Sequence, residues 1–205
     1  MNHIELITQN FLQLIEMGQN PIEWDDLNAR IQQVGETCKL SNALKLILTS
    51  TGSVTKSLEV LSNNAITVST IFQNVREIDE KATKLIEFLD IEPKDRVNFR
   101  EVWLTDGENN YVFAMSITPI KRLADKFKDD LTKADVPIGR LIAKYSLECR
   151  REIYSLSNIR NIHLKNLGIK WNSLGESAQI PYRCYNIINN GCILMCIIEF
   201  FHPEI

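Results

Sequence analysis

The sequence lacks the strong positive charge that nucleic-acid-binding proteins use against phosphate. Its 205 residues contain 23 Lys and Arg against 26 Asp and Glu, which gives a net charge of −3. Before Ser41 only Arg30 and Lys39 are basic, whereas six residues are acidic. We therefore expect no nucleic-acid partner and no phosphate-binding module at the N-terminus.

Long hydrophobic runs are missing as well. The longest apolar stretch, residues 192–198, is far shorter than the ~20 residues needed to cross a bilayer. The first ten residues, MNHIELITQN, have neither the basic start nor the apolar core of a secretory signal. We expect a soluble protein without a membrane span, located in the cytoplasm, or in the plastid stroma if an organelle encodes it.

Metal-binding, nucleotide-binding and disulfide patterns are also absent. The five cysteines form no CxxC pair, and an odd number does not suit a complete disulfide framework. Cys184, Cys192 and Cys196 lie in apolar, strand-like sequence, so we expect them to be reduced and buried. Glycine-rich phosphate loops do not occur. The sequence thus predicts no cofactor and no metal.

Two β-hairpins are the clearest local structures in the chain. In the first, NFREVWL and YVFAMSI flank an Asp106-Gly107 turn; in the second, IPYRCYNII and CILMCIIEF flank Asn190-Gly191. Glycine supplies the positive φ angle that such turns require. Two further β-rich segments begin near residues 65 and 147, which brings the expected number of strands to six.

Helical periodicity occupies most of the remaining sequence. Apolar residues recur at helical spacing from Ile4 to Ile15, and Ser53 is placed to cap a helix that follows it. Further helices are expected in residues 21–34, 81–89, 123–131 and 137–145. The prediction is a single α+β domain over residues 1–205, a six-stranded antiparallel sheet with helices on one face, preceded by a helical extension in residues 1–40.

Glu199 is the most informative residue of the last predicted strand, because every other residue of CILMCIIEF is apolar. Alternation places it on the same face as Ile193, Met195 and Ile197. A carboxylate on a buried strand must be paired, protonated or functional, since an isolated buried charge costs several kcal/mol. Glu199 therefore either reaches solvent or a structural partner, or takes part in chemistry.

Arg100 raises the same question in NFREVWL. It shares a face with Val102 and Leu104, whereas Glu101 points to the other side. An arginine in an apolar pocket suits a small carboxylated ligand, because the guanidinium holds a carboxylate through two hydrogen bonds. The alternative is a structural ion pair of Arg100 with Glu199 or Glu101.

Other arginines are weaker candidates. Arg150 and Arg151 are adjacent on a predicted strand, so at most one of them faces inward. Arg183, in IPYRCYN, could add a second positive charge to a pocket. We expect all three on the solvated surface.

Five segments follow one another over about residues 44–203: LILTSTGSVTKSLEVL, ITVSTIFQN, FREVWLTDGENNYVFAMSITP, VPIGRLI and IIEFFHP. In this order they resemble the chorismate pyruvate-lyase family, in the branch found in archaea, mycobacteria, cyanobacteria and red-algal plastids. The resemblance implies a six-stranded antiparallel sheet with a buried ligand site. It also implies a lyase that uses no cofactor, converts chorismate to 4-hydroxybenzoate and pyruvate, and feeds quinone or related aromatic biosynthesis.

The resemblance also implies roles for four residues. Arg100 would bind the aromatic carboxylate, and Glu199 would contact the oxygen side of the ring. The backbone near Val54, in GSVT, and near Ile138, in PIGR, would close over the ligand. Arg100 and Glu199 are thus the expected catalytic residues, with Glu199 acting either as a general acid on the departing ether oxygen or on the ring proton.

One position departs from the family pattern. Many relatives have an arginine in the strand after the Asp-Gly turn, where this sequence has Met115. The partner of the second carboxylate of chorismate is therefore open, and Arg183 or Lys56 could substitute. The same fold also serves as a non-catalytic effector-binding domain in bacterial regulators, so a module that senses an aromatic acid is the alternative function.

Overall fold

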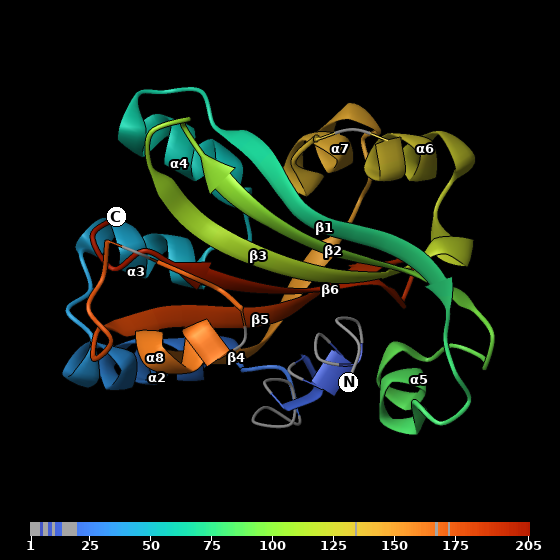
Figure 1. Cartoon of the computed structure of the whole chain (residues 1–205), viewed down its shortest axis with the longest axis horizontal. Helices are drawn as coiled ribbons and strands as arrows, with labels where there is room; N and C mark the ends of the chain where they lie inside the picture. The colour runs from blue at the N-terminus through green and yellow to red at the C-terminus, as the bar shows by residue number, and fades with distance from the viewer. Residues whose placement is uncertain are drawn as a thin grey trace.

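Six antiparallel strands form one curved sheet through the middle of the molecule (Figure 1). The computed structural model describes residues 5, 8–9, 11–13, 20–133, 135–166, 168–171 and 173–205. The strand order is β1-β2-β3-β6-β5-β4. The strands are β1 (Thr67–Glu77), β2 (Arg96–Thr105), β3 (Asn110–Pro119), β4 (Arg150–Arg160), β5 (Gln179–Asn189) and β6 (Cys192–Phe201). The predicted α+β fold with a six-stranded antiparallel sheet is confirmed.

Both predicted hairpins are present, and their turns have the expected backbone geometry. Gly107 has φ 98°, and the β5–β6 turn has positive φ at Asn190 and Gly191, 50° and 76°. The Asp106 carboxylate accepts hydrogen bonds from the backbone N–H of Asn109 and Glu108 and from the Tyr111 hydroxyl. These bonds hold the pKa of Asp106 well below its usual range. The side chain of Asp106 thus fixes the backbone of the first turn.

Helices occupy most of the segments where the sequence predicted them. Ser41 and Ser53 cap α3 and α4 by accepting hydrogen bonds from the backbone N–H of Leu44 and Lys56. The helix predicted from Ile4 to Ile15 lies largely outside the described residues. The described helices are α2 (Trp24–Thr37), α3 (Asn42–Thr49), α4 (Val54–Ser62), α5 (Thr83–Leu89), η1 (Ile120–Arg122), α6 (Asp125–Lys133), α7 (Ile138–Lys144) and α8 (Asn161–Asn166). None of these is long and apolar enough to span a membrane.

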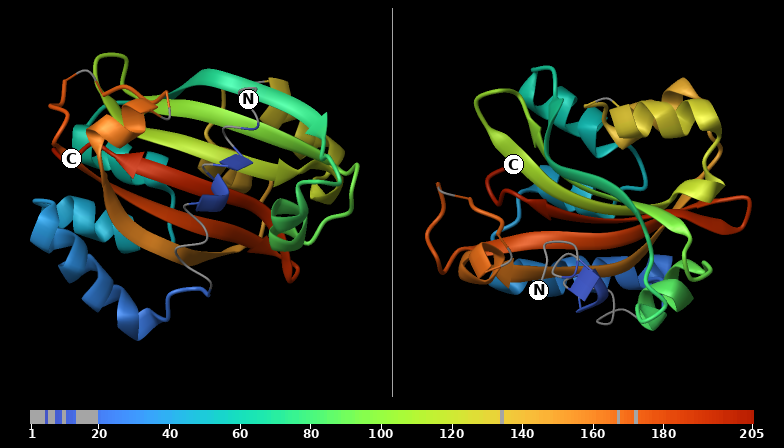
Figure 2. Two further views of the ribbon diagram at one scale, coloured as in Figure 1. Left: turned by 60° about the horizontal axis from the view of Figure 1, so that its bottom comes forward. Right: turned by 45° about the vertical axis from the view of Figure 1, so that its right-hand side comes forward.

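The two faces of the sheet carry different side chains, and we call them the arginine face and the cysteine face. The arginine face contains Arg100, Val102, Arg183 and Glu199. It is covered by α3, α4, α6 and α7, while α2 packs along the edge strand β4. Figures 1 and 2 show α4, α6 and α7 together on this side. This is the helical layer that the sequence predicted.

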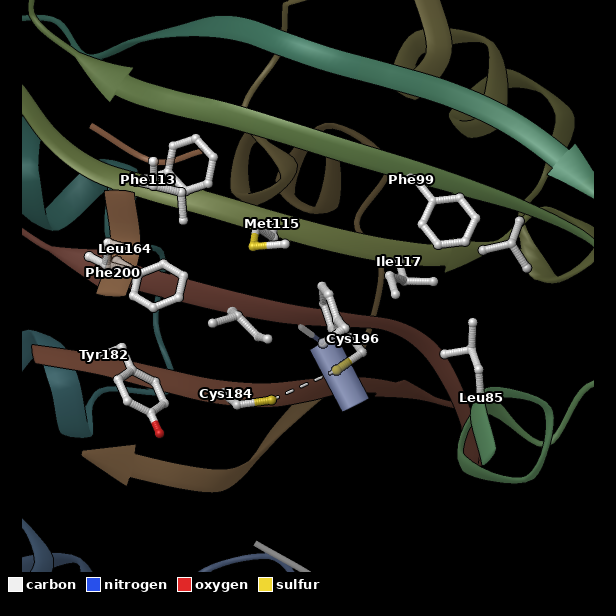
Figure 3. Close-up of a cluster of buried hydrophobic side chains, with 14 of the residues drawn as sticks. Leu85, Phe99, Phe113, Met115, Ile117, Leu164, Tyr182, Cys184, Cys196 and Phe200 are labelled. Atoms are coloured by element: carbon white, nitrogen blue, oxygen red, sulfur yellow. Dashed lines mark hydrogen bonds between the residues drawn. The ribbon is translucent and has the colours of Figure 1, made fainter. Parts of the chain in front are cut away.

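The opposite side, the cysteine face, carries Cys184, Cys196, Phe99, Met115 and Phe200 in one apolar cluster (Figure 3). Two short helices also pack here through Leu85, Leu89 and Leu164: α5, which lies within the predicted helix 81–89, and α8. Helices therefore lie on both faces, whereas the sequence predicted them on one. The prediction that three thiols of the last hairpin are buried is right for two of them. Cys192 is exposed, because it is the first residue of β6 after the turn.

Candidate functional site

A pocket lies between the arginine face and the first turns of α4 and α7. Its empty volume, including the open mouth, is about 520 Å³, which is within the usual range for small-molecule sites. The lining comes from strands β2, β3, β5 and β6, from one residue of each edge strand, and from the two helices. The four residues singled out from the sequence, Arg100, Glu199, Val54 and Ile138, all line it.

Arg100 is buried in this pocket with only part of its hydrogen-bonding capacity used. Its side chain is 2% exposed, and Nη1 donates to the Val136 carbonyl at 3.1 Å. Nε and Nη2 are buried and have no partner among the described residues. Burial lowers the pKa of Arg100, and the nearby charge of Asp135 partly opposes this. Two unpaired, buried donors on a cation are well suited to bind an anionic ligand.

Glu199 is also buried, and both of its oxygens accept hydrogen bonds. Arg183 Nε donates to Oε2 at 2.8 Å, and the Tyr185 hydroxyl donates to Oε1 at 3.1 Å. Burial and the Glu199 charge raise the pKa of Tyr185, so its hydroxyl keeps its proton. Glu199 therefore has a structural partner, Arg183, and also lines the pocket. Among the described residues, Arg100 forms no ion pair with Glu199 or with Glu101.

Arg183 is fully buried, so its expected place on the surface is wrong. It lies on the inner strand β5, between β6 and the edge strand β4, directly opposite Glu199 in the register with β6. Its Nη1 donates to the carbonyls of Ile47, Leu48 and Ser50 at the end of α3, at 2.8, 3.2 and 2.7 Å. Arg183 thus joins Glu199 to the end of α3, where the helix dipole favours a cation. It does not line the pocket.

Arg151 lines the pocket from β4, whereas Arg150 does not. Arg150 is 65% exposed and pairs with Glu152, 2.7 Å away. Arg151 donates through Nη1 to the Thr51 carbonyl, and its guanidinium carbon lies 5.9 Å from the centre of the Tyr185 ring. The prediction that at most one of the two faces inward is therefore confirmed, and the surface position expected for Arg151 is wrong.

Met115 and Lys56 do not contribute to the pocket. Met115 is buried on the cysteine face, while its neighbours Ala114 and Ser116 line the pocket. An arginine at position 115 would therefore point away from the ligand site. Lys56 is 75% exposed and lies 3.6 Å from Glu59.

One wall of the pocket is formed by a tight contact between the N-terminal ends of α4 and α7. A Cβ atom added to Gly139 would lie 2.5 Å from Ser53 Oγ, so only glycine allows this approach. Arg140 pairs with Glu59 of α4 and donates to the Ile66 carbonyl. The GSVT and PIGR segments are thus held together over the site. Ser53 Oγ accepts the hydrogen bond of one first-turn N–H group of α4, that of Lys56.

Comparison with known proteins places the chain in a family. Residues 48–205 match the model of the family described as "Chorismate pyruvate-lyase Rv2949c-like". The chain is 35% identical over 178 residues to MJ0807 of Methanocaldococcus jannaschii, a protein provisionally named a lyase. That match covers 83% of this chain and 84% of the relative.

Solved structures share the fold at low sequence identity. The effector domain of PhnF from Mycobacterium smegmatis matches with a TM-score of 0.52 and 12% identity, over 75% of this chain and 90% of that one. The gene product SA0254 from Staphylococcus aureus matches with a TM-score of 0.53 and 14% identity, over 76% and 90%. These likenesses concern the fold alone.

Proposed function

Because the chain belongs to the chorismate pyruvate-lyase Rv2949c-like family, we propose that its pocket converts chorismate to 4-hydroxybenzoate and pyruvate. The observation that carries the proposal is Arg100, a buried cation with two unpaired donors in the same pocket as the carboxylate of Glu199. The arginine can bind the carboxylate of the ring, and the glutamate can accept the proton that the ring must lose.

The reaction is an elimination whose atoms balance without a cofactor. The ring carbon that bears the hydroxyl group loses a proton, and the bond between the ring and the ether oxygen breaks. The leaving enolpyruvate takes up a proton and becomes pyruvate, while the ring becomes aromatic. Because aromatisation provides the driving force, the protein needs to orient the ring and to move one proton.

Arg100 would hold the ring carboxylate through its free Nε and Nη2 donors. A guanidinium can present two parallel N–H groups to one carboxylate, which fixes the direction of the ring as well as its position. Backbone groups around Val54 and Ile138, at the α4–α7 contact, would close over the ring and exclude water.

Glu199 would accept the ring proton. Two roles follow from the family resemblance, donation to the ether oxygen or acceptance of the ring proton. Glu199 accepts a hydrogen bond from Arg183 Nε and donates none to a described residue, and this acceptor geometry supports the second role. Tyr185 would keep the other oxygen oriented.

Incubation of the purified protein with chorismate after treatment with a chelator tests the proposal. We expect 4-hydroxybenzoate and pyruvate in equal amounts, followed by chromatography and by a coupled assay for pyruvate. Dependence on an added divalent ion would contradict the scheme. Heat-denatured protein controls for the spontaneous decay of chorismate.

A sensor of aromatic acids is the second candidate, because the effector domain of PhnF has the same fold. In that case the protein binds 4-hydroxybenzoate in the same pocket but forms no pyruvate. Calorimetric titration with 4-hydroxybenzoate, carried out beside the turnover assay, separates the two functions.

A further inference from the structure

Arg151 lies on the same face of the sheet as Arg100 but near the other end of the strand order. Arg100 is on β2 and Arg151 on β4, with β3, β6 and β5 between them. At ~4.8 Å per strand, the two backbones are about 19 Å apart along the sheet. Both long side chains reach into one pocket, with Glu199 and Tyr185 between them in the strand order. The pocket therefore contains two arginine side chains that come from widely separated strands.

The guanidinium of Arg151 is only partly satisfied. It makes one hydrogen bond, to the Thr51 carbonyl, and its Nε is buried without a partner among the described residues. Within the part of the chain that the structure describes, no Asp or Glu forms an ion pair with Arg151. Arg150, Arg140 and Arg183 each have a carboxylate partner there. A buried donor left unpaired costs free energy that an anionic ligand can recover.

The charges around the pocket do not balance. Arg100 and Arg151 line it together with Glu199, and Arg183 stands behind Glu199. Counted with Asp135, whose charge acts on Arg100, these groups are three positive charges against two negative charges. The remaining positive charge suits the second carboxylate of chorismate, which the product 4-hydroxybenzoate lacks.

We propose that Arg151 binds the second carboxylate of the substrate, the one on the leaving enolpyruvyl group. The inference rests on the proposed function and assigns Arg151 a task that Arg100 does not have. Arg100 contacts the ring carboxylate, which substrate and product share, whereas Arg151 contacts a group that departs as pyruvate. The site then binds its substrate through two arginines and its aromatic product through one, which favours release of the product.

Arg151→Gln tests the proposal, with Arg150→Gln as a matched control from the same strand. For Arg151→Gln we expect KM for chorismate to rise about 10- to 100-fold, the effect of losing a charged hydrogen bond. Affinity for 4-hydroxybenzoate, measured by calorimetry, stays within about threefold. Arg151→Lys should recover part of the loss because it keeps the charge. Arg150→Gln should change neither constant.

Two outcomes overturn the assignment: equal weakening of chorismate and 4-hydroxybenzoate binding, or no change in either. Melting curves identify a variant that fails to fold, and Arg151→Lys then provides the same comparison. If the unmodified protein binds chorismate but does not turn it over, the proposed function fails. Titration with intact chorismate then measures the contribution of Arg151 directly. Absence of chorismate binding overturns both proposals.

Discussion

The two faces of the sheet are built from alternate residues of the same strands, yet they differ sharply in chemistry. On β6, Cys196, Ile198 and Phe200 pack into an apolar cluster, whereas Glu199 between them faces the pocket. The cysteine face buries apolar area, which stabilises the fold. The arginine face buries charged groups, which costs desolvation energy unless they are paired. Side-chain alternation lets one sheet serve stability on one side and ligand binding on the other.

The largest expected effect is on stability and comes from the cysteine face. Phe200 is fully buried there, and its ring centre lies 5.6 Å from that of Tyr182. Phe200→Ala should lower the free energy of unfolding by about 3–5 kcal/mol, because it leaves a cavity. Denaturant unfolding measures this loss. Affinity of the remaining folded protein for 4-hydroxybenzoate should be nearly unchanged; a large drop would mean that the two faces are not separable.

Arg100→Ala should have the opposite effect: a large loss of ligand affinity and little change in the free energy of unfolding. Loss of a charged contact in a desolvated pocket costs on the order of 2–4 kcal/mol, so product affinity should fall roughly 30- to 1000-fold. Unfolding should be little affected, because Arg100 makes one hydrogen bond to a described residue. Calorimetry with 4-hydroxybenzoate tests this expectation, with the exposed Lys56→Ala as control. Unchanged affinity would place the ligand elsewhere.

Glu199→Gln separates binding from chemistry within the arginine face. The amide keeps the shape but cannot take up the ring proton, so kcat should fall by ~10²-fold or more. Affinity for 4-hydroxybenzoate should stay within about tenfold. Steady-state kinetics and product titration measure the two quantities, and circular dichroism checks that Arg183 still holds α3. Normal turnover would show that Glu199 has only a structural role.

The smallest effect is expected from the thiols. Cys192 is exposed and should react rapidly with a thiol reagent in the folded protein, without loss of ligand binding. Cys184 and Cys196 are buried, and burial raises the pKa of the Cys196 thiol, so both should react only after unfolding. Mass spectrometry of the labelled protein identifies the sites. Rapid labelling of Cys184 or Cys196 would contradict the packing of the cysteine face.

Local patterns in the sequence were sufficient for the hairpins and for the faces of Arg100 and Glu199. Alternation along a strand has a period of two, and a buried strand that is apolar throughout makes a single charge conspicuous. The same argument applied to IPYRCYN would have found Arg183, since Ile180, Tyr182 and Cys184 around it are buried as well.

Contacts between segments far apart in the sequence could not be predicted from the pattern of single strands. Arg183 bonds to the Ile47 carbonyl, 136 positions away, and Arg151 bonds to the Thr51 carbonyl, 100 positions away. Both contacts depend on where α3 and its following loop lie over the sheet. Val54 and Ile138, which the resemblance named, line the pocket, and Gly139 allows α7 to approach Ser53 there.

The position of β6 bears on how the chain reaches its native state during synthesis. Although β6 follows every other strand in the sequence, it lies between β3 and β5. Before residues 192–201 leave the ribosome, the nascent chain can form only two separate half-sheets, β1-β2-β3 and β4-β5. Each half-sheet then has an unpaired inner edge, which invites association with other chains. Insertion of β6 covers both inner edges and brings Glu199 to Arg183, so the continuous sheet and the complete pocket arise in the same event.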